Sequence, residues 1–443
     1  MSAADSNSST GDRQPERAHD PYAALRIPGF RWYLMGNLLF LIGINMQTAA
    51  ISWEIFARTQ DYKFLAYVGL VQILPVIGLF MPAGHIIDRV NRKKLLIIAI
   101  GSAVLWSSGL AVCSAVEARL RWMYLLLFLI GAARSFLQPA RSAFLPQIVP
   151  MEVFPNAVTW HSTAFQLSTA IGPALGGLLI AGFNNATAVY VITAAFALFN
   201  CLCIARIEAR PYVRASEPPS LASLMGGLSF VWKSKVMLAA ITLDMFAVLL
   251  GGATALLPGF ATDVLHAGPK GFGWMRAAPG IGAVVMSLAL AHRPPFERAG
   301  RVLLLAVAGF GAATIVFGLS RNFALSLTML LALGALDMIS VVIRHTVVQL
   351  LTPDAMRGRV SAVNGMFIGI SNELGEFESG MVAELFHRPD DKTFGPTVSA
   401  VSGGIGTMLV VGLVAIFSPA LRKYGRLDGQ RPGTGSTPSA GSK

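Results

Sequence analysis

Charged residues are scarce in this chain, because Lys, Arg, Asp and Glu together make up only 13% of its 443 residues. An ordinary soluble domain carries about 25%. So few charges leave too little polar surface to cover a soluble globule of this length. The shortage excludes a soluble enzyme, and the high apolar content excludes a disordered protein.

Cysteine is equally scarce, with only Cys113, Cys201 and Cys203, all in apolar stretches. Three cysteines cannot build a disulfide scaffold, and we expect them to behave as small buried apolar side chains. A single residue between Cys201 and Cys203 is too short a spacing for zinc ligands. We therefore expect no metal site.

The sequence also lacks a phosphate-binding P-loop, a Ser-His-Asp order and a metalloprotease helix. We therefore expect no enzyme, no ATP-driven pump and no cofactor. The net charge of +12 does not indicate a nucleic-acid partner, because the basic residues lie in short runs between apolar stretches.

Long apolar runs are what the sequence does contain. Hydrophobic residues make up 54% of the chain, about 239 residues, which would fill about 12 helical spans of about 20 residues each. The runs are continuous and do not alternate with period two, which favours helices over a β-barrel. We predict an all-α integral membrane protein of 12 transmembrane helices. The expected spans are 33–56, 64–83, 95–116, 122–138, 157–182, 186–204, 236–258, 272–291, 302–319, 322–343, 360–386 and 396–418.

The widest polar gap divides these spans into two sets of six. We predict a disordered tail at 1–20, a six-helix half at 21–205, a linker at 206–235, a second six-helix half at 236–421 and a disordered tail at 422–443. With both tails on one side of the membrane, that side receives 26 of the 35 Lys and Arg residues. The positive-inside rule then predicts that both termini are cytoplasmic.

The two halves resemble each other at an offset of 203 residues. The matched pairs are Gly131 with Gly334, Arg134 with Asp337, Arg141 with Arg344, Pro150 with Pro353, Gly172 with Gly375, and Gly177 with Gly380. Parallel repeats of this kind are a transporter architecture, with the substrate site between the halves near mid-membrane. The alternative is a chance match of small residues in Gly-rich helices.

The loop after the second span combines one acid with several bases: Gly84, Asp88, Arg89, Arg92 and Lys93. Asp88 can accept charge-assisted hydrogen bonds, so the loop can act as a conformational latch. The alternative is a solvated basic loop that only orients the chain. The loop closely resembles the signature of the major facilitator superfamily. Asn91 replaces the usual Gly, and because Asn tolerates a left-handed backbone we expect the turn to be kept.

The fifth span contains Gly172, Pro173, Gly176 and Gly177, and is similar to the antiporter motif of superfamily exporters, with Ser168 in place of its first Gly. The resemblance implies export in exchange for protons, whereas small residues alone could form a packing face. Stretches at 138–143, 353–360 and 372–377 resemble the enterobactin-exporter and macrolide-efflux branch, a drug:proton antiporter group.

Several charges fall inside the expected spans. Glu373 and Glu376 share one helical face, so we expect mutual repulsion to keep at least one protonated, unless hydroxyls or an Arg satisfy the pair. The proton-coupling candidates are Glu373, Glu376, Asp337 and Asp244. The cavity candidates are Gln47, Arg134 and Phe246, with Arg134 placed to pair with Asp337 across the centre.

These features indicate a secondary active transporter that exports a small amphipathic molecule, a siderophore or a drug, by alternating access in a bacterial inner membrane. The proton gradient takes the place of a cofactor, and the expected partners are the lipid bilayer, the substrate and protons, with the protein monomeric. The alternatives are a facilitator or importer without proton coupling, and a polytopic membrane enzyme or sensor.

Overall fold

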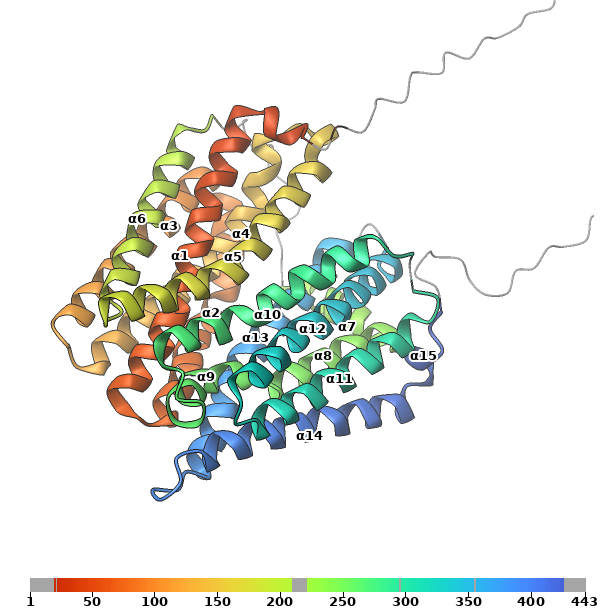
Figure 1. Ribbon diagram of the computed structural model, residues 1–443. Coiled ribbons are helices and arrows are strands. Elements are labelled where there is room, and N and C mark those ends of the chain that lie inside the picture. Colours follow the sequence, from red (N-terminus) through yellow and green to blue (C-terminus); the bar gives the residue numbers. More distant parts are fainter. Residues whose placement is uncertain (1–19, 21, 209–220, 295, 354–355, 426–443) are drawn as a thin grey trace, which may run out of the picture.

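The structure is a computed structural model that describes residues 20, 22–208, 221–294, 296–353 and 356–425. The predicted tails lie almost wholly outside these residues. The described part of the first half forms a bundle of long helices joined by short turns (Figure 1). Its helices are η1 (Ala24–Arg26), α1 (Pro28–Thr59), α2 (Tyr62–Arg89), α3 (Arg92–Ala115), α4 (Leu120–Ile148), η2 (Met151–Val153), α5 (Phe154–Phe183) and α6 (Thr187–Arg206).

The second half repeats this plan with one interruption. Its helices are α8 (Lys235–Leu250), η3 (Ala253–Leu256), α9 (Leu257–Gly259), η4 (Phe260–Val264), α10 (Gly268–Ala291), α11 (Ala299–Leu319), α12 (Phe323–Leu351), α13 (Arg357–Leu385), α14 (Phe394–Phe417) and α15 (Pro419–Arg422). The expected span at 236–258 lies within one candidate membrane span, Lys235–Val264, but its helix is not continuous. The helix breaks at Gly251 and Gly252, which are poor helix formers, and restarts ahead of Pro258.

Within the described residues, 11 helices are long and apolar enough to cross a membrane. The twelfth is α13, which is 29 residues long but carries acidic and basic side chains along its length. Its hydropathy is low because it faces other helices and the interior of the protein. With α13 counted, the 12 expected spans correspond one to one with observed helices, so the predicted fold class is confirmed.

The expected linker at 206–235 contains a further helix, α7 (Leu221–Lys233). Val231 of α7 is buried in a small apolar cluster with Val348 and Val360, so α7 packs against the second half. Residues 209–220 lie outside the described residues.

The hydrophobic cores show how the halves meet. We call the end of the bundle where the chain enters α1 the tail end, and the end that holds the α1–α2 turn the far end. One core cluster near the far end draws on both halves, from Ile42 to Ala400. The clusters nearer the tail end each belong to one half, since one spans residues 24–207 and the others begin at Leu228 and Val236.

Matched glycines make matched contacts, which shows that the internal repeat is structural. Gly131 of α4 lies against the carbonyl of Gln72 in α2, and its mate Gly334 of α12 lies against the carbonyl of Pro279 in α10. A side chain at either position would collide with backbone, so both positions keep two helices in close approach.

The next pair in the repeat behaves in the same way. A Cβ added to Gly172 of α5 would lie 2.6 Å from the Cβ of Asn45 in α1, and one added to Gly375 of α13 would lie 2.7 Å from the carbonyl oxygen of Val248 in α8. Asn45 and Val248 are themselves 203 residues apart. The fifth helix of each half is thus packed on the first helix of that half.

Candidate functional site

A cavity of about 480 Å³ lies between the two halves. Its size falls in the range of small-molecule sites, about 300–1,000 Å³. Helices of both halves line it, through Asn45, Arg134, Thr169, Pro173, Val248, Gly251, Gly252, Thr254, Arg276, Pro279, Gly280, Phe310, Leu330, Leu333, Gly334, Asp337, Asn372 and Glu376. The lining combines an apolar majority with a few charged side chains, as in binding sites that orient an amphipathic ligand.

Interruptions of the helices make part of this wall. Pro173 lies inside α5 and Pro279 inside α10, and each removes one backbone hydrogen bond from its helix. The break at Gly251 and Gly252 separates α8 from η3. Polar backbone groups freed in this way are tolerated at membrane depth where they line a cavity.

Arg134, at the wall of the cavity, joins the two halves. Its Nη1 lies 2.9 Å from Oε1 of Glu373 in α13 and also donates to Oε1 of Gln72 in α2 at 3.4 Å. Gly69 of α2 allows this approach, because a Cβ there would lie 2.6 Å from the carbonyl oxygen of Glu373. The expected pairing of Arg134 with Asp337 is therefore wrong, since Glu373 of the second half takes the guanidinium.

Glu376 has a separate partner. Nη2 of Arg276 lies 3.8 Å from its Oε1, and Nη1 of Arg276 donates to the carbonyl oxygen of Thr254 at 3.2 Å. Glu373 and Glu376 thus each face a guanidinium of their own. Each carboxylate is compensated by its own arginine. The geometry therefore does not show the dominant mutual repulsion that we expected, and agrees with the alternative in which an Arg satisfies the pair.

Arg276 was missed as a site residue. It lies well inside α10 and lines the cavity. The signal was present, because Arg276 stands between Met275 and Ala277 within the expected span 272–291. A basic residue inside an apolar span is by default a candidate functional residue, because an ionised group at that depth is costly to keep without a role.

Asp337 lines the cavity and also a second cavity of about 10 Å³, which it shares with Asp244, Phe310 and Ser340. No ion pair or hydrogen bond joins its carboxylate to another side chain in the part of the chain that the structure describes. Asp244, by contrast, forms a buried ion pair with Arg344 of α12.

The two remaining cavity candidates lie elsewhere. Gln47 is buried and accepts a hydrogen bond from Ser107 of α3 at 2.7 Å, beside a separate cavity of about 20 Å³. Phe246 is 36% exposed on α8 and is not among the residues that line the 480 Å³ cavity. Neither prediction agrees with the lining of the large cavity, because the position of a helix in the bundle does not fix the direction of one side chain.

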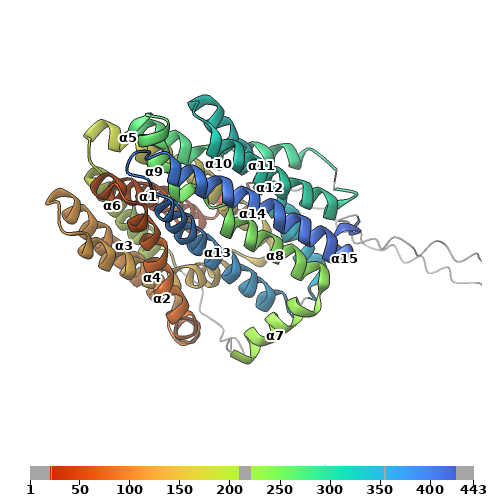
Figure 2. The ribbon, with the colours of Figure 1, turned by 90° about the horizontal axis from the view of Figure 1, so that it is seen from below.

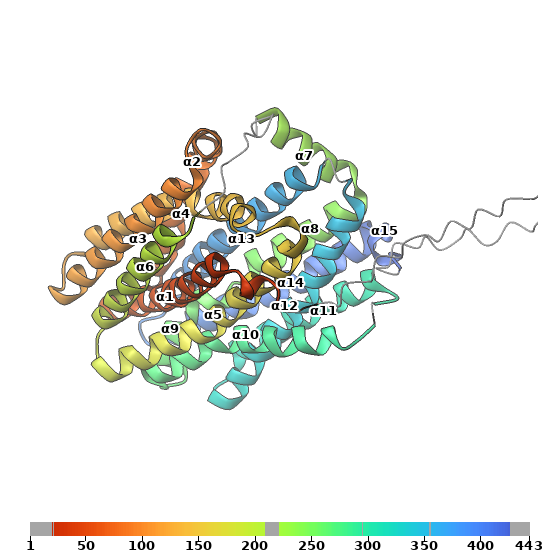
Figure 3. The same cartoon turned by 90° about the horizontal axis from the view of Figure 1, so that it is seen from above.

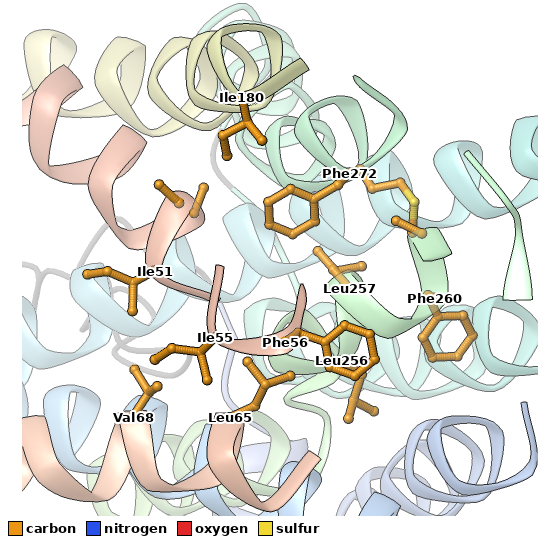
Figure 4. Packing of buried hydrophobic residues seen from close by; sticks show 14 of the residues in the cluster. Ile51, Ile55, Phe56, Leu65, Val68, Ile180, Leu256, Leu257, Phe260 and Phe272 are labelled. Atoms are coloured by element: carbon orange, nitrogen blue, oxygen red, sulfur yellow. The ribbon is translucent and has the colours of Figure 1, made fainter. Parts of the chain in front are cut away.

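Apolar side chains of both halves close the far end. Figure 4 shows Phe56 of the first half beside Leu256 and Leu257 of the second, and Ile55 and Leu65 belong to the same buried cluster. The rings of Trp53 and Phe272 also meet across the halves, with centroids 5.2 Å apart. The cavity is thus sealed by packed hydrocarbon on that side.

Two helix pairs hold the halves together near this seal. α5 runs alongside α10, and α2 alongside α13 (Figures 2 and 3). Gly177 of α5 touches the backbone of Gly273 in α10, and a Cβ on its repeat mate Gly380 of α13 would lie 2.9 Å from the backbone nitrogen of Ala66 in α2. The other glycine of the expected antiporter motif, Gly176, packs on Met46 of α1, and Pro173 lines the cavity.

An ion pair lies at the turn between α1 and α2, beyond the apolar far-end core. Nζ of Lys63 lies 2.6 Å from Oδ2 of Asp61, and the backbone N–H of Lys63 donates to Oδ1. Burial raises the pKa of the Asp61 carboxyl, but the hydrogen bonds from Lys63 outweigh it and hold the pKa below its usual value. Asp61 remains charged at neutral pH.

The expected latch is only partly described. Gly84, Asp88 and Arg89 fall in α2, but their side chains lie outside the described residues. Nζ of Lys93 donates to the carbonyl oxygens of Ala205 and Ile207 at the end of α6, at 2.8 and 2.7 Å.

Arg92 is partly buried at the start of α3. Asn91 does not adopt the expected left-handed backbone, since its φ is −58°. Its side chain instead accepts hydrogen bonds from the N–H groups of Lys93 and Lys94, which caps α3.

Comparison with known proteins gives a consistent result. The profile of transmembrane secretion effectors matches residues 19–417. The chain is 25% identical over 411 residues to the enterobactin exporter EntS of Escherichia coli O6:K15:H31 (strain 536 / UPEC), covering 92% of this chain and 96% of that protein. It is also 25% identical over 399 residues to EntS of Shigella boydii serotype 18, covering 90% and 93%.

Solved structures support the same fold at lower identity. A bacterial homolog of the human lysosomal transporter Spinster, in an inward-facing and occupied conformation, has a TM-score of 0.68 at 13% identity, covering 92% of this chain and 99% of that one. The nucleoside transporter NupG has a TM-score of 0.62 at 14% identity, covering 89% and 98%.

Proposed function

Because this chain belongs to the transmembrane secretion effector family of the major facilitator superfamily, we propose that it is a proton-coupled exporter of a small amphipathic molecule. It is a multi-pass membrane transporter and not an enzyme. The observation that carries the proposal is the ion pair between Arg134 and Glu373, which joins the two halves at the wall of the cavity.

Alternating access follows from the distribution of the cores. Among the described residues, the apolar core that both halves build lies at the far end and the other clusters each stay within one half, which supports a state closed at the far end. Rocking the halves about the cavity would separate this core and bring the tail ends together. The glycine contacts at Gly177 and Gly380 place backbone against backbone where such a movement would pivot.

Proton coupling acts through the inter-half ion pair. Protonation of Glu373 removes the charge that holds Arg134, so the contact between α4 and α13 weakens and the halves can separate at that point. One proton entering at 100 mV releases about 2.3 kcal/mol, which supports a roughly 40-fold gradient of a neutral substrate at about 1.4 kcal/mol per tenfold. Glu376 supports the same step less directly, because its partner Arg276 belongs to the same half.

Orientation and location complete the proposal. The bias of 26 of 35 basic residues toward the tail side supports cytoplasmic termini, and the similarity to EntS of Escherichia coli supports a bacterial inner membrane. The far-end seal then faces outward and the cavity receives its cargo from the cytoplasm. A siderophore or drug fits both the cavity and the similarity to EntS, and the protein works as a monomer with the proton gradient as its energy source.

Transport by everted membrane vesicles tests the coupling. A deletion strain is first screened for drug sensitivity and for loss of secreted metabolites, which identifies a cargo. Wild-type vesicles should then accumulate that cargo in a protonophore-sensitive manner. Glu373→Gln should retain cargo exchange at equilibrium but lose accumulation against a gradient, because a neutral residue cannot release a proton. Glu152→Gln, an exposed acid in η2, is the matched control and should accumulate normally.

Accumulation that resists the protonophore would instead indicate a facilitator without proton coupling. Uptake into whole cells without any gain in resistance would indicate an importer. Accumulation at the wild-type level in both Glu373→Gln and Glu376→Gln would remove the assignment of these two carboxylates.

A further inference from the structure

The charges around the cavity do not balance within the described residues. Arg134 faces Glu373 and Arg276 faces Glu376, so each of these guanidinium groups already has a carboxylate. Asp337 remains, and its carboxylate has no cationic partner in the described residues. With all five groups ionised, the four charged residues that line the cavity and Glu373, the partner of Arg134, together carry one negative charge more than positive charges.

The cation that shares α12 with Asp337 is already engaged. Arg344 lies seven residues further along α12 and forms its ion pair with Asp244 of α8. Arg344 and Asp244 are both almost fully buried, so the pair is not free to turn toward the cavity without leaving a buried charge behind. The small cavity of about 10 Å³ between Asp244 and Asp337 has room for about one water molecule.

The surroundings of Asp337 suit an organic cation. Phe310 of α11 lines both cavities together with Asp337, so an aromatic side chain and a carboxylate border the same space. Leu330, Leu333 and Val248 provide apolar wall beside them. A cation on an apolar frame would gain an ion pair and a contact with the ring, in a site where the carboxylate otherwise has neither.

An anionic cargo fits less well. Arg134 is the most exposed charge of the site, with 49% of its side chain accessible, and could attract an anion. It is already bonded to Glu373 and Gln72, however, so an anion would have to displace a carboxylate and leave it unpaired. The resulting penalty counts against anion binding at this position.

We propose that the cavity binds a monovalent organic cation and that Asp337 carries the countercharge. The inference rests on the proposed function and names the charge class of its cargo. It makes Asp337 a specificity-determining residue, while the Arg134–Glu373 pair serves the coupling between the halves.

Equilibrium binding of two ions of the same shape tests the charge preference. Tetraphenylphosphonium and tetraphenylborate differ chiefly in the sign of their charge. The full-length protein in nanodiscs at pH 8, with empty nanodiscs as the blank, should bind the phosphonium ion at least about tenfold more tightly, the effect of one charged contact. Asp337→Asn should lower phosphonium affinity about tenfold, Asp337→Glu should retain it, and the exposed-loop control Asp390→Asn should bind as the wild type does.

Equal or tighter binding of tetraphenylborate would overturn the inference, as would an unchanged phosphonium affinity in Asp337→Asn or the absence of binding of either ion. The ratio of the two affinities in the wild type stands even if Asp337→Asn fails to fold. Because the measurement needs no transport, these outcomes are distinguishable from failure of the proposed function, which would leave vesicles unable to accumulate any cargo.

Discussion

The two halves of the molecule share a frame and differ in their charges. The frame is the set of matched glycines, whose contacts repeat from one half to the other at the same offset. The charges diverge at positions that the same offset aligns. Arg134 of the first half corresponds to Asp337 of the second, and the first contributes a cation to the cavity where the second contributes an acid.

The buried acid of the first half, among the described residues, is fully engaged. Glu54 of α1 is bound by Arg58 and accepts a hydrogen bond from the Tyr190 hydroxyl at 2.7 Å, so it forms part of a closed structural cluster. The acids at the cavity wall, Asp337 and Glu376, belong to the second half. Repetition thus preserves the helix contacts of both halves, while the acids that line the cavity belong to the second half alone among the described residues.

The matched arginines Arg141 and Arg344 give the largest expected contrast. Arg344→Met should destabilise the protein by about 3–5 kcal/mol, because it leaves Asp244 as a buried carboxylate without a partner. Arg141 instead lies over the ring of Phe40, 5.1 Å from its centroid. Arg141→Met should therefore lose only about 0.5–2 kcal/mol. Thermal unfolding in detergent measures both changes.

The double variant Asp244→Asn with Arg344→Met sharpens this contrast. Removing both charges leaves no buried ion, so most of the lost stability should return. Equal losses for the two single arginine variants would mean that the halves do not differ at this position, and the comparison would fail there.

The glycines between the halves should give a medium effect that is equal in both halves. Gly177→Ala brings a Cβ onto the backbone of Gly273, and Gly380→Ala brings one onto Ala66. Each should destabilise the far-end-closed state by about 1–3 kcal/mol, as overpacking does. Transport should fall and solvent accessibility of a cysteine introduced at the far end should rise in both variants.

Gly182→Ala is the matched control, because nothing lies within 4 Å of a Cβ at that position of α5. It should leave transport unchanged or add slightly to helix stability. A defect confined to one of the two contact glycines would show that the shared frame is not used symmetrically.

Most of the fold could be predicted from the sequence, because the length of each apolar span and the offset of the repeat can be read directly from the chain. Partners across the halves were harder to predict. Arg134 and Glu373 are 239 residues apart, and no local pattern could favour Glu373 over Asp337 as the partner. The direction of Phe246 depended on the rotation of α8, which an almost uniformly apolar helix does not reveal. Arg276, in contrast, was visible as a lone cation in an apolar run.

The smallest expected effect concerns the hydrogen bonds that connect helix ends within each half at the tail end. In the second half, backbone N–H groups of Ala299 and Gly300 donate to carbonyls at 424 and 425, whereas in the first half the Lys93 side chain reaches Ala205 and Ile207. Of these two connections, a side-chain substitution can therefore remove the one in the first half, because its donor is the Lys93 side chain. Lys93→Met should lose about 0.5–1.5 kcal/mol of stability, measured by thermal unfolding, while the exposed neighbour Lys94→Met should lose almost nothing. A fall in transport without that loss of stability would instead assign Lys93 to the latch, because a latch changes the balance of conformations and leaves the folded bundle intact.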